Sequence, residues 1–291
     1  MSIKIVTDST ADLSPELINR YGINIVPLSV TFGEEVYLDG IDLTPETFLE
    51  KVKTSPDFPK TGQANPATFL ELYRRLLAEG HEIFFVGISS DLSGTYASAC
   101  LAAAELGDAP IATVDSRNLS MGIGILALQA AELAEQGFSL SEIVARVTGM
   151  TSRIRTSFIV NSLDFLYKGG RLTRTQALVG NVLQIHPRIE VIDGKMSVPE
   201  KFRGSKAKAN TRLLEWATDN RENIDDNWIS VTHCDDHESA LQIADQLREM
   251  KLARNIVITQ AGAVISTHCG PGTVGILYLE NSPCCSPSNE E

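Results

Sequence analysis

The sequence is short of positive charge and has no long apolar run. Its 25 Lys and Arg residues stand against 37 Asp and Glu residues, so the formal net charge is −12 at pH 7. Surfaces that bind nucleic acid, or that dock on anionic lipid by charge, are basic. We therefore expect no nucleic-acid partner and at most transient membrane contact. No stretch of eighteen apolar residues occurs, so we also expect no membrane span.

Cysteine is scarce as well. The five cysteines are an odd number and lack the spacing of a disulfide framework, which favours reduced thiols. Residues 1–8 predict a strand, since they have neither the basic start nor the apolar stretch of a signal peptide. We therefore expect a cytoplasmic protein.

Several nucleotide-binding and catalytic motifs are missing too. The sequence contains no G-x-x-x-x-G-K-[ST] loop, no G-x-G-x-x-G turn, no G-x-S-x-G elbow and no H-E-x-x-H pair. These absences argue against binding of ATP or NAD through the standard loops. A chain of 291 residues with 43% hydrophobic residues nevertheless has ample material for one large domain or two ordinary ones.

Strand and helix signals alternate in the first half of the chain. The predicted strands are residues 3–7, 23–28, 83–88 and 111–114, and predicted helices begin at residues 15, 45, 66 and 95 and span 119–136 and 140–154. The unbroken apolar run at 83–88 is typical of a parallel strand covered on both faces. The alternation predicts an α/β fold whose first domain, residues 1–155, has a mostly parallel sheet with flanking helices.

The second half of the chain has a different order of predicted strands and helices. Residues 185–192 and 195–198 predict a β-hairpin with an Asp193-Gly194 turn. The other predicted elements are strands at 157–160, 229–233 and 255–259, and helices at 162–167, 205–223, 237–250 and 262–268. We expect an α+β domain with an antiparallel element over residues 156–280, followed by a disordered tail at 281–291.

Two segments far apart in the sequence suggest a binding site. The apolar run at 83–88 leads into a turn with four hydroxyl residues, Ser89, Ser90, Ser93 and Thr95, in which Gly94 allows a close backbone approach. Ligands of open α/β sheets bind at the carboxyl ends of strands, and helix N-termini attract anions. Near the other end of the chain, His268 precedes a Gly270-Pro271-Gly272 turn. We interpret the two segments as an anion site made of hydroxyls, amides and one histidine.

Other constellations leave alternatives open. Ser93 with His268 as base could form a hydrolase site, although no orienting third residue is evident. Asp8 and Asp12 could serve metal-dependent phosphotransfer, but their spacing is better explained by a polar loop at a strand end. The run at 233–237 resembles a metal cluster but lacks a second ligand pair, so a strand end with a helix cap explains it adequately.

The ordered motifs resemble the DegV family of bacterial fatty-acid-binding proteins, the acyl-carrying subunits of fatty acid kinase. The resemblance covers nearly the whole chain except the tail. It is carried by residues 7–13, 61–63, 89–99, 114–116, 168–172 and 268–275.

The resemblance implies a two-domain DegV-like fold with an apolar tunnel that residues 156–280 complete. It implies a long-chain fatty acid whose carboxylate is held by Thr61 and Ser93 with His268 nearby, in a site shaped by Gly62, Gly94, Thr95 and Gly270. It further implies no metal or cofactor, no catalysis by this chain alone, and a role in phospholipid metabolism. The partner would be a separate ATP-dependent kinase that phosphorylates the bound acyl group, with Arg171 and Arg203 as candidates for partner contact or site closure.

The sequence departs from the family pattern in the loop that carries Thr61. That loop usually reads T-S-Q-P, whereas here Gly62 replaces the serine and two residues separate Gln63 from Pro66. One hydroxyl is lost, so we expect a thinner or water-filled network around the head group.

Overall fold

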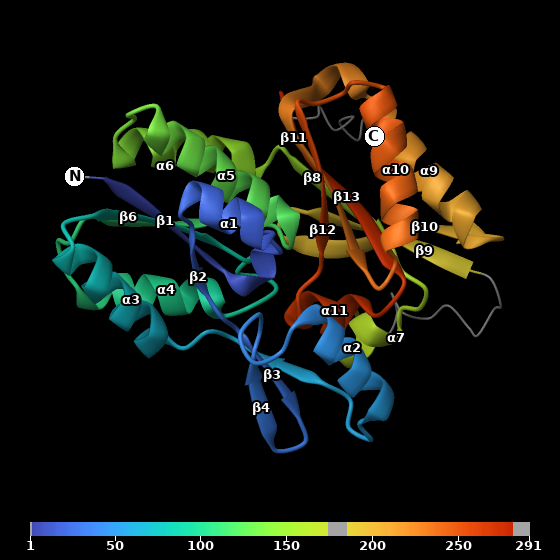
Figure 1. Ribbon diagram of the computed structural model, residues 1–291, viewed down its shortest axis with the longest axis horizontal. Helices are drawn as coiled ribbons and strands as arrows, with labels where there is room; N and C mark the ends of the chain where they lie inside the picture. Colours follow the sequence, from blue (N-terminus) through green and yellow to red (C-terminus); the bar gives the residue numbers. More distant parts are fainter. Residues whose placement is uncertain (1, 174–184, 282–291) are drawn as a thin grey trace, which may run out of the picture.

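The computed structural model describes residues 2–173 and 185–281, which form three β-sheets (Figure 1). The first sheet has the strand order β2-β1-β6-β7 and is parallel throughout. Its strands are β1 (Ile3–Asp8), β2 (Asn24–Val26), β6 (Glu82–Gly87) and β7 (Ile111–Asp115). This confirms the parallel sheet predicted for the first half of the chain.

Helices cover both faces of the parallel sheet. Along β6, Ile83 and Phe85 belong to the core formed with α3 (Pro66–Ala78) and α4 (Thr95–Glu105). Phe84 and Val86 face the opposite core. That second core is formed with α1 (Pro15–Tyr21), α5 (Met121–Glu135) and α6 (Leu140–Thr151). Successive side chains of a strand point to opposite faces, so a strand covered on both sides is apolar at every position.

Local signals set the start of α1, the end of α1 and the start of α6 as predicted, whereas α6 ends at Thr151 and not at the predicted residue 154, which begins a strand. Ser14 caps α1 by accepting the N–H of Leu17, Pro15 is its first residue, and Gly22 ends it in a left-handed conformation with φ of 59°. Ser139 and Glu142 form the predicted capping box at the start of α6.

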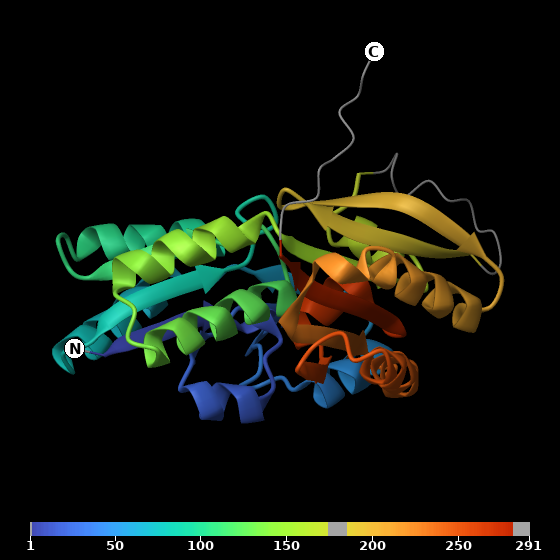
Figure 2. The same cartoon turned by 90° about the horizontal axis from the view of Figure 1, so that it is seen from above.

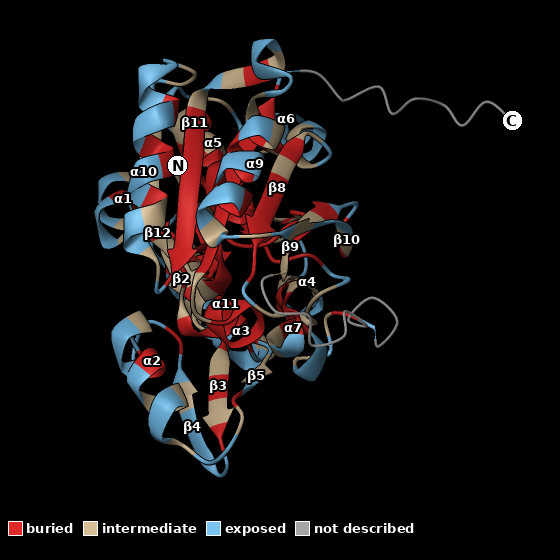
Figure 3. Ribbon diagram, turned by 90° about the vertical axis from the view of Figure 1, so that its right-hand side faces the viewer, coloured by how far each residue is buried: buried red, intermediate tan, exposed pale blue. Residues whose placement is uncertain are grey.

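The second sheet has six strands in the order β10-β9-β8-β13-β11-β12, and the β11–β12 pair alone is parallel within it. Its strands are β8 (Ile154–Ile159), β9 (Ile185–Ile192), β10 (Lys195–Arg203), β11 (Ile224–Cys234), β12 (Asn255–Gln260) and β13 (Thr273–Glu280). Helices α9 (Lys206–Thr218) and α10 (His237–Glu249) bury their apolar sides on it and expose their outer sides (Figure 3). The predicted Asp193-Gly194 hairpin is confirmed, and both turn residues have positive φ.

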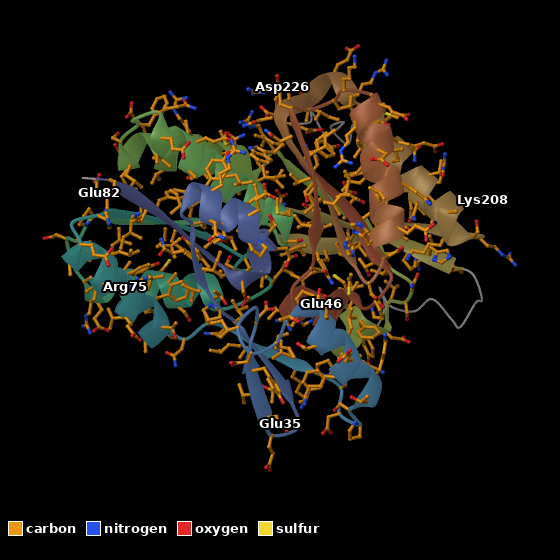
Figure 4. The ribbon with its side chains drawn as sticks, in the orientation of Figure 1. Glu35, Glu46, Arg75, Glu82, Lys208 and Asp226 are labelled. Carbon is orange, nitrogen blue, oxygen red and sulfur yellow. The ribbon has the colours of Figure 1, made fainter. Side chains whose placement is uncertain are left out.

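Helix α5 joins the two large sheets. It is apolar around nearly its whole circumference, and it packs on β1 and β6 as well as on β13, β11 and β8. Seen from above, the two sheets lie side by side with α5 reaching their junction (Figure 2). Labelled charged side chains such as Glu35, Lys208 and Asp226 point outward from this body (Figure 4).

The third sheet is small and antiparallel, with the order β4-β3-β5. Its strands are β3 (Ser29–Phe32), β4 (Glu35–Leu38) and β5 (Lys60–Gly62), and α2 (Pro45–Thr54) accompanies them. This sheet and α2 pack on α11 (Ala263–Cys269), close to α7 (Asp164–Lys168). Residues 29–62 therefore lie beside the C-terminal part of the chain and are not part of the parallel sheet.

Several sequence predictions needed correction. The third sheet and β13 were not predicted, although all eight residues of β13 are buried. The helix predicted to residue 223 ends at Thr218, because a 3₁₀ turn, η2 (Arg221–Asn223), and β11 follow. Because the first residues of β11 are acidic, the sequence did not predict that they belong to a strand. The predicted domain division at residue 155 falls inside β8 and stays a prediction. Beyond Asn281, the predicted tail lies outside the described residues.

Two buried carboxylates fix the N-terminus of α11. The Gly262 N–H donates to Asp12 Oδ1 over 2.8 Å, and the Ala263 N–H donates to Asp39 Oδ1 over 2.7 Å. The Ser120 hydroxyl donates to the other oxygen of Asp12 over 2.5 Å. Free N–H groups at a helix start attract negative charge. Segments from the first half of the chain thus position the helix that carries His268.

Burial makes these carboxyl groups hard to ionise. It raises the pKa of Asp39 from 3.8 to about 6, with a smaller contribution from the charge of Asp8. Burial also raises the pKa of Asp12 well above its ordinary value and raises that of Asp8. In each case the loss of hydration outweighs the hydrogen bonds that favour the carboxylate.

We predict that Asp39→Asn removes part of the pH dependence of stability. Because the folded state holds the Asp39 proton more tightly than the unfolded state, its stabilisation is complete below about pH 4 and is lost as the pH rises through about 6. Between pH 4 and pH 7 the wild type should lose roughly 2 kcal/mol of unfolding free energy relative to the variant. Urea unfolding at several pH values measures this difference. The exposed Asp108→Asn should follow the wild type, and parallel wild-type and Asp39→Asn curves would refute the prediction.

Candidate ligand-binding site

A narrow cavity of about 30 Å³ lies where the three sheets meet. Its walls come from β5 and the loop after it, the turn after β6, the start of β10, and α11. The lining residues are Leu28, Thr61, Gly62, Gln63, Ile88, Leu92, Ser93, Leu119, Arg171, Met196, Val264, Ile265, His268 and Cys269.

The three predicted head-group residues line this one cavity. Thr61 Oγ1 and His268 Nε2 are 2.9 Å apart, although 207 positions separate them in the sequence. Ser93 Oγ lies 2.9 Å from Thr95 Oγ1 and accepts the Thr95 N–H over 3.2 Å. Since apolar side chains form most of the remaining wall, the cavity has a polar end and an apolar body.

The turn that carries Ser93 is organised by Ser89. The carbonyl of Ser89 accepts the N–H groups of Leu92 and Ser93 over 2.9 and 3.0 Å. Helix α4 then begins after Gly94 without a side-chain cap. The first amides of α4 are therefore directed towards this turn, as the sequence predicted.

Of the four residues predicted to shape the site, Gly62 lines the cavity, whereas Gly94, Thr95 and Gly270 lie outside its wall. Thr95 Oγ1 accepts the Ala64 N–H over 3.3 Å, which ties the loop of Thr61 to the turn of Ser93. A Cβ on Gly94 would lie 2.0 Å from Gln63 Oε1. A Cβ on Gly62 would lie 2.5 Å from Ser29 Oγ, so the hydroxyl of Ser29 fills the space where a serine at 62 would begin. Gly270, with φ of 76°, closes α11 against the ring of Phe165.

His268 is neutral in this setting. It is only 8% exposed, and burial lowers its pKa to about 3, with the charge of Arg171 acting in the same direction. Its Nδ1 is buried without a hydrogen-bond partner among the described residues, and it lies against Gly169, where a Cβ would approach to 2.1 Å. The imidazole can therefore donate or accept one hydrogen bond at Thr61 but supplies no positive charge.

Arg171 supplies the positive charge that His268 does not. It is half-buried in the cavity wall, where Nη1 donates to the Gly169 carbonyl over 2.7 Å and Nη2 to the Leu92 carbonyl over 3.0 Å. From its sequence position Arg171 was expected to contact a partner or close the site, and the anion site was expected to lack a fixed cation. Arg203, at the end of β10, is exposed and does not line the cavity.

A second cavity of about 30 Å³ adjoins the first, and the two share Leu119, Ile265 and Cys269 as wall residues. Sequence reasoning did not find it, because its walls come from five separate segments. Its other lining residues are Ser120, Thr156, Phe158, Thr232, His233, Cys234, Ala261, Thr273, Gly275 and Leu277.

The hydroxyl groups in the second cavity are already engaged. Thr156 donates to Asn118 Oδ1, Ser120 to Asp12 Oδ2, and Thr273 to the carbonyls of Cys269 and Gly270. When a side-chain hydroxyl is hydrogen-bonded within the protein, mainly the carbon atoms of that side chain face the cavity. This compartment is therefore more apolar than its residue types suggest.

The geometry does not favour the rival sites. No hydrogen bond joins Ser93 to His268 among the described side chains; their partners are Thr95 and Thr61. Asp8 and Asp12 accept hydrogen bonds from Ile88, Thr10, Gly262 and Ser120. Over residues 2–173 and 185–281, no group of three His, Cys, Asp or Glu residues could hold a metal ion. The run at 233–237 ends β11 and caps α10 through Asp236.

Comparison with known proteins defines the class to which this fold and site belong. The family model described as "Uncharacterised protein, DegV family" matches residues 2–281. A DegV domain-containing protein of Caldanaerobacter subterraneus is 36% identical over 279 residues, which cover 96% of this chain and 99% of the relative. The chain belongs to the DegV family.

Solved structures agree in fold over almost the full length. A DegV family protein from Thermus thermophilus, whose structure is described in terms of fatty acid binding, has a TM-score of 0.89 and 32% identity, covering 96% of this chain and 100% of that one. A stearic-acid-binding protein from Eubacterium ventriosum has a TM-score of 0.86 and 28% identity, covering 96% and 98%. Within the described part of this chain, no helix has both the length and the apolar character needed to cross a membrane.

We predict that His268 does not titrate near neutral pH. Its burial and the neighbouring charge of Arg171 place its pKa at about 3, far below that of a free histidine. Imidazole NMR signals recorded between pH 4.5 and 8, assigned by comparison with His268→Gln, should show no titration step for this residue. A midpoint near 6.5 would contradict the buried, neutral state.

Proposed function

We propose that this protein binds a long-chain fatty acid in the two adjoining cavities and presents its carboxylate to an ATP-dependent fatty acid kinase. The observation that carries the proposal is the wall of the first cavity, which combines the polar groups of Thr61, Ser93, Arg171 and His268 with mostly apolar side chains. Relatives described as fatty-acid-binding support it.

The acyl chain would supply most of the affinity. Burying a sixteen-carbon tail gains roughly 12 kcal/mol at about 0.8 kcal/mol per methylene, against an association cost of about 4–15 kcal/mol. The apolar body of the first cavity and the satisfied hydroxyls of the second offer such a tail few unpaired polar groups. Wall residues from both sides of residue 155 contribute, in keeping with a tunnel that residues 156–280 complete.

The head group would be held by neutral donors beside one arginine. A buried carboxylate needs partners for its lone pairs. Ser93 and Thr61 can each donate a hydroxyl hydrogen, and Arg171 has donors beyond the two that its carbonyl partners accept. Because His268 is neutral, the ligand would meet one positive charge and would keep an oxygen available for phosphorylation.

We infer that the chain is a non-catalytic subunit in the cytoplasm. A serine hydrolase needs a base that is hydrogen-bonded to its nucleophile and a third group that orients the base. The arrangement of Ser93, Thr61 and His268 does not favour such a role. A fluorophosphonate probe should leave Ser93 unlabelled, and rapid labelling would favour the hydrolase alternative.

Ser93→Ala, Thr61→Val and Arg171→Gln should each weaken fatty acid binding. Loss of one buried hydrogen-bond donor costs about 1–3 kcal/mol, or roughly 5- to 150-fold in Kd. Native mass spectrometry of the purified protein, with lipid extraction, should first show a mass increment of one fatty acid; titration with oleate then ranks the variants. Thr211→Val, on the exposed side of α9, is the matched control. Unchanged affinity in all three variants would refute the site, and a protein that never takes up oleate would refute the function.

Arg203→Ala should leave oleate affinity unchanged and slow acyl phosphate formation by the kinase, by about tenfold for a lost contact of 1.4 kcal/mol. The reason is that Arg203 is exposed and lies outside the cavity wall. The measurement is ATP consumption with saturating oleate and the kinase subunit. Arg212→Ala, an exposed arginine paired with Glu215 on α9, is the control. Loss of oleate binding with unchanged turnover would overturn this assignment.

A further inference from the structure

The tip of the β9–β10 hairpin, Asp193 and Gly194, is fastened to the loops that support the binding site. Ser89 Oγ donates to the Gly194 carbonyl over 2.9 Å, and Arg117 Nη2 donates to the Asp193 carbonyl. Ser89 is fully buried, and it lies 105 positions from its partner. These contacts join the second sheet directly to the loops after β6 and β7.

The fit at the hairpin tip leaves no room for a methyl group. A Cβ on Gly194 would lie 2.5 Å from Ser89 Oγ and 2.7 Å from Arg117 Cζ. Gly194 also has φ of 81°, as the two-residue turn requires. The hairpin tip is therefore seated closely against Ser89 and Arg117.

The residues on both sides of this contact are close in sequence to residues that line the first cavity. On one side, Ser89 organises the turn through its carbonyl, and the next residues of that turn, Leu92 and Ser93, line the cavity. On the other side, Met196 lies two residues beyond Gly194 and also lines the cavity. Separation of the hairpin tip from Ser89 would thus move Met196 away from Leu92 and Ser93 and open the wall between them.

Arg117 is placed to hold this wall closed. Its Nη1 lies 2.6 Å from Asp91 Oδ2 and 3.6 Å from Asp115 Oδ2, and it donates to Ser90 Oγ over 3.3 Å. Its backbone has φ of 52°, and its N–H donates to Asp115 Oδ1. The side chain is about one-third exposed, so its ion pairs are open to screening by salt.

We propose that the hairpin tip is a strap over the acyl cavity and that Arg117 is the positioning residue that fastens it. The proposal rests on the proposed function and adds a control of ligand exchange. Release of the Arg117 and Ser89 contacts lets the β9–β10 hairpin swing from the Ser93 turn, and the acyl chain passes through the gap. Arg117 does not touch the ligand, so it governs the rate of exchange more than the affinity.

The test is exchange of bound oleate for perdeuterated oleate, followed by native mass spectrometry. Arg117→Ala and Gly194→Ala should exchange at least tenfold faster than the wild type, with a Kd that changes less than the rate. The controls are Arg74→Ala, which removes an exposed ion-paired arginine, and Gly80→Ala, where φ is 84° but no atom lies within 4 Å of the new Cβ. Both controls should exchange at the wild-type rate.

A second readout needs only the wild type and one variant. Raising the ionic strength should accelerate exchange in the wild type, because salt weakens the Arg117–Asp91 pair, and should have a smaller effect in Arg117→Ala. Unchanged exchange in both strap variants, or equal salt dependence with and without Arg117, overturns the strap while leaving fatty acid binding intact. A wild-type chain that takes up no oleate overturns the proposed function and the strap with it.

Discussion

The site depends on how the short helix α11 is held at its two ends. Asp12 and Asp39 receive the first N–H groups of this helix, and His268 near its other end meets Thr61 at 2.9 Å. Burying carboxylates is costly unless donors satisfy them, and free helix amides are such donors. Because these partners come from three separate segments, the polar end of the cavity forms only when the whole chain is folded.

The way in which α11 is held also determines which charged groups lie near a ligand in the first cavity. The carboxylates lie at the N-terminal end of α11, and a helix of its seven residues is about 10 Å long. Hydrogen bonds hold them there, so they are turned away from an anion at the His268 end. Burial keeps His268 neutral, and Arg171 contributes the positive charge. The site can therefore attract a carboxylate without surrounding it with cations.

The sequence indicated much of this because some signals are local. The apolar run at 83–88 predicted both β6 and the position of the Ser93 turn at its end, and the Asp193-Gly194 pair predicted a hairpin. The missing parts depend on contacts between distant segments. No local pattern in the sequence indicates that β5 pairs with β3, that Asp39 is buried under α11, or which residues line the second cavity. The sequence did not indicate that Arg171 lines the cavity, because basic residues in an acidic chain are usually at the surface.

A cavity that binds an acyl chain tightly must still have one wall that can move. The wall formed by α11 is held by buried carboxyl groups, whose separation from the helix amides would leave acceptors and donors unpaired in a dry interior. The wall formed by the β9–β10 hairpin is held instead by a serine hydroxyl and an arginine that is partly open to water. Water can replace the partners of Arg117 as they part, so these ion pairs cost less to open than the contacts of the buried carboxyl groups. The proposed strap therefore places the moving wall at the hairpin tip, where Arg117 is open to water, and the fixed wall at α11.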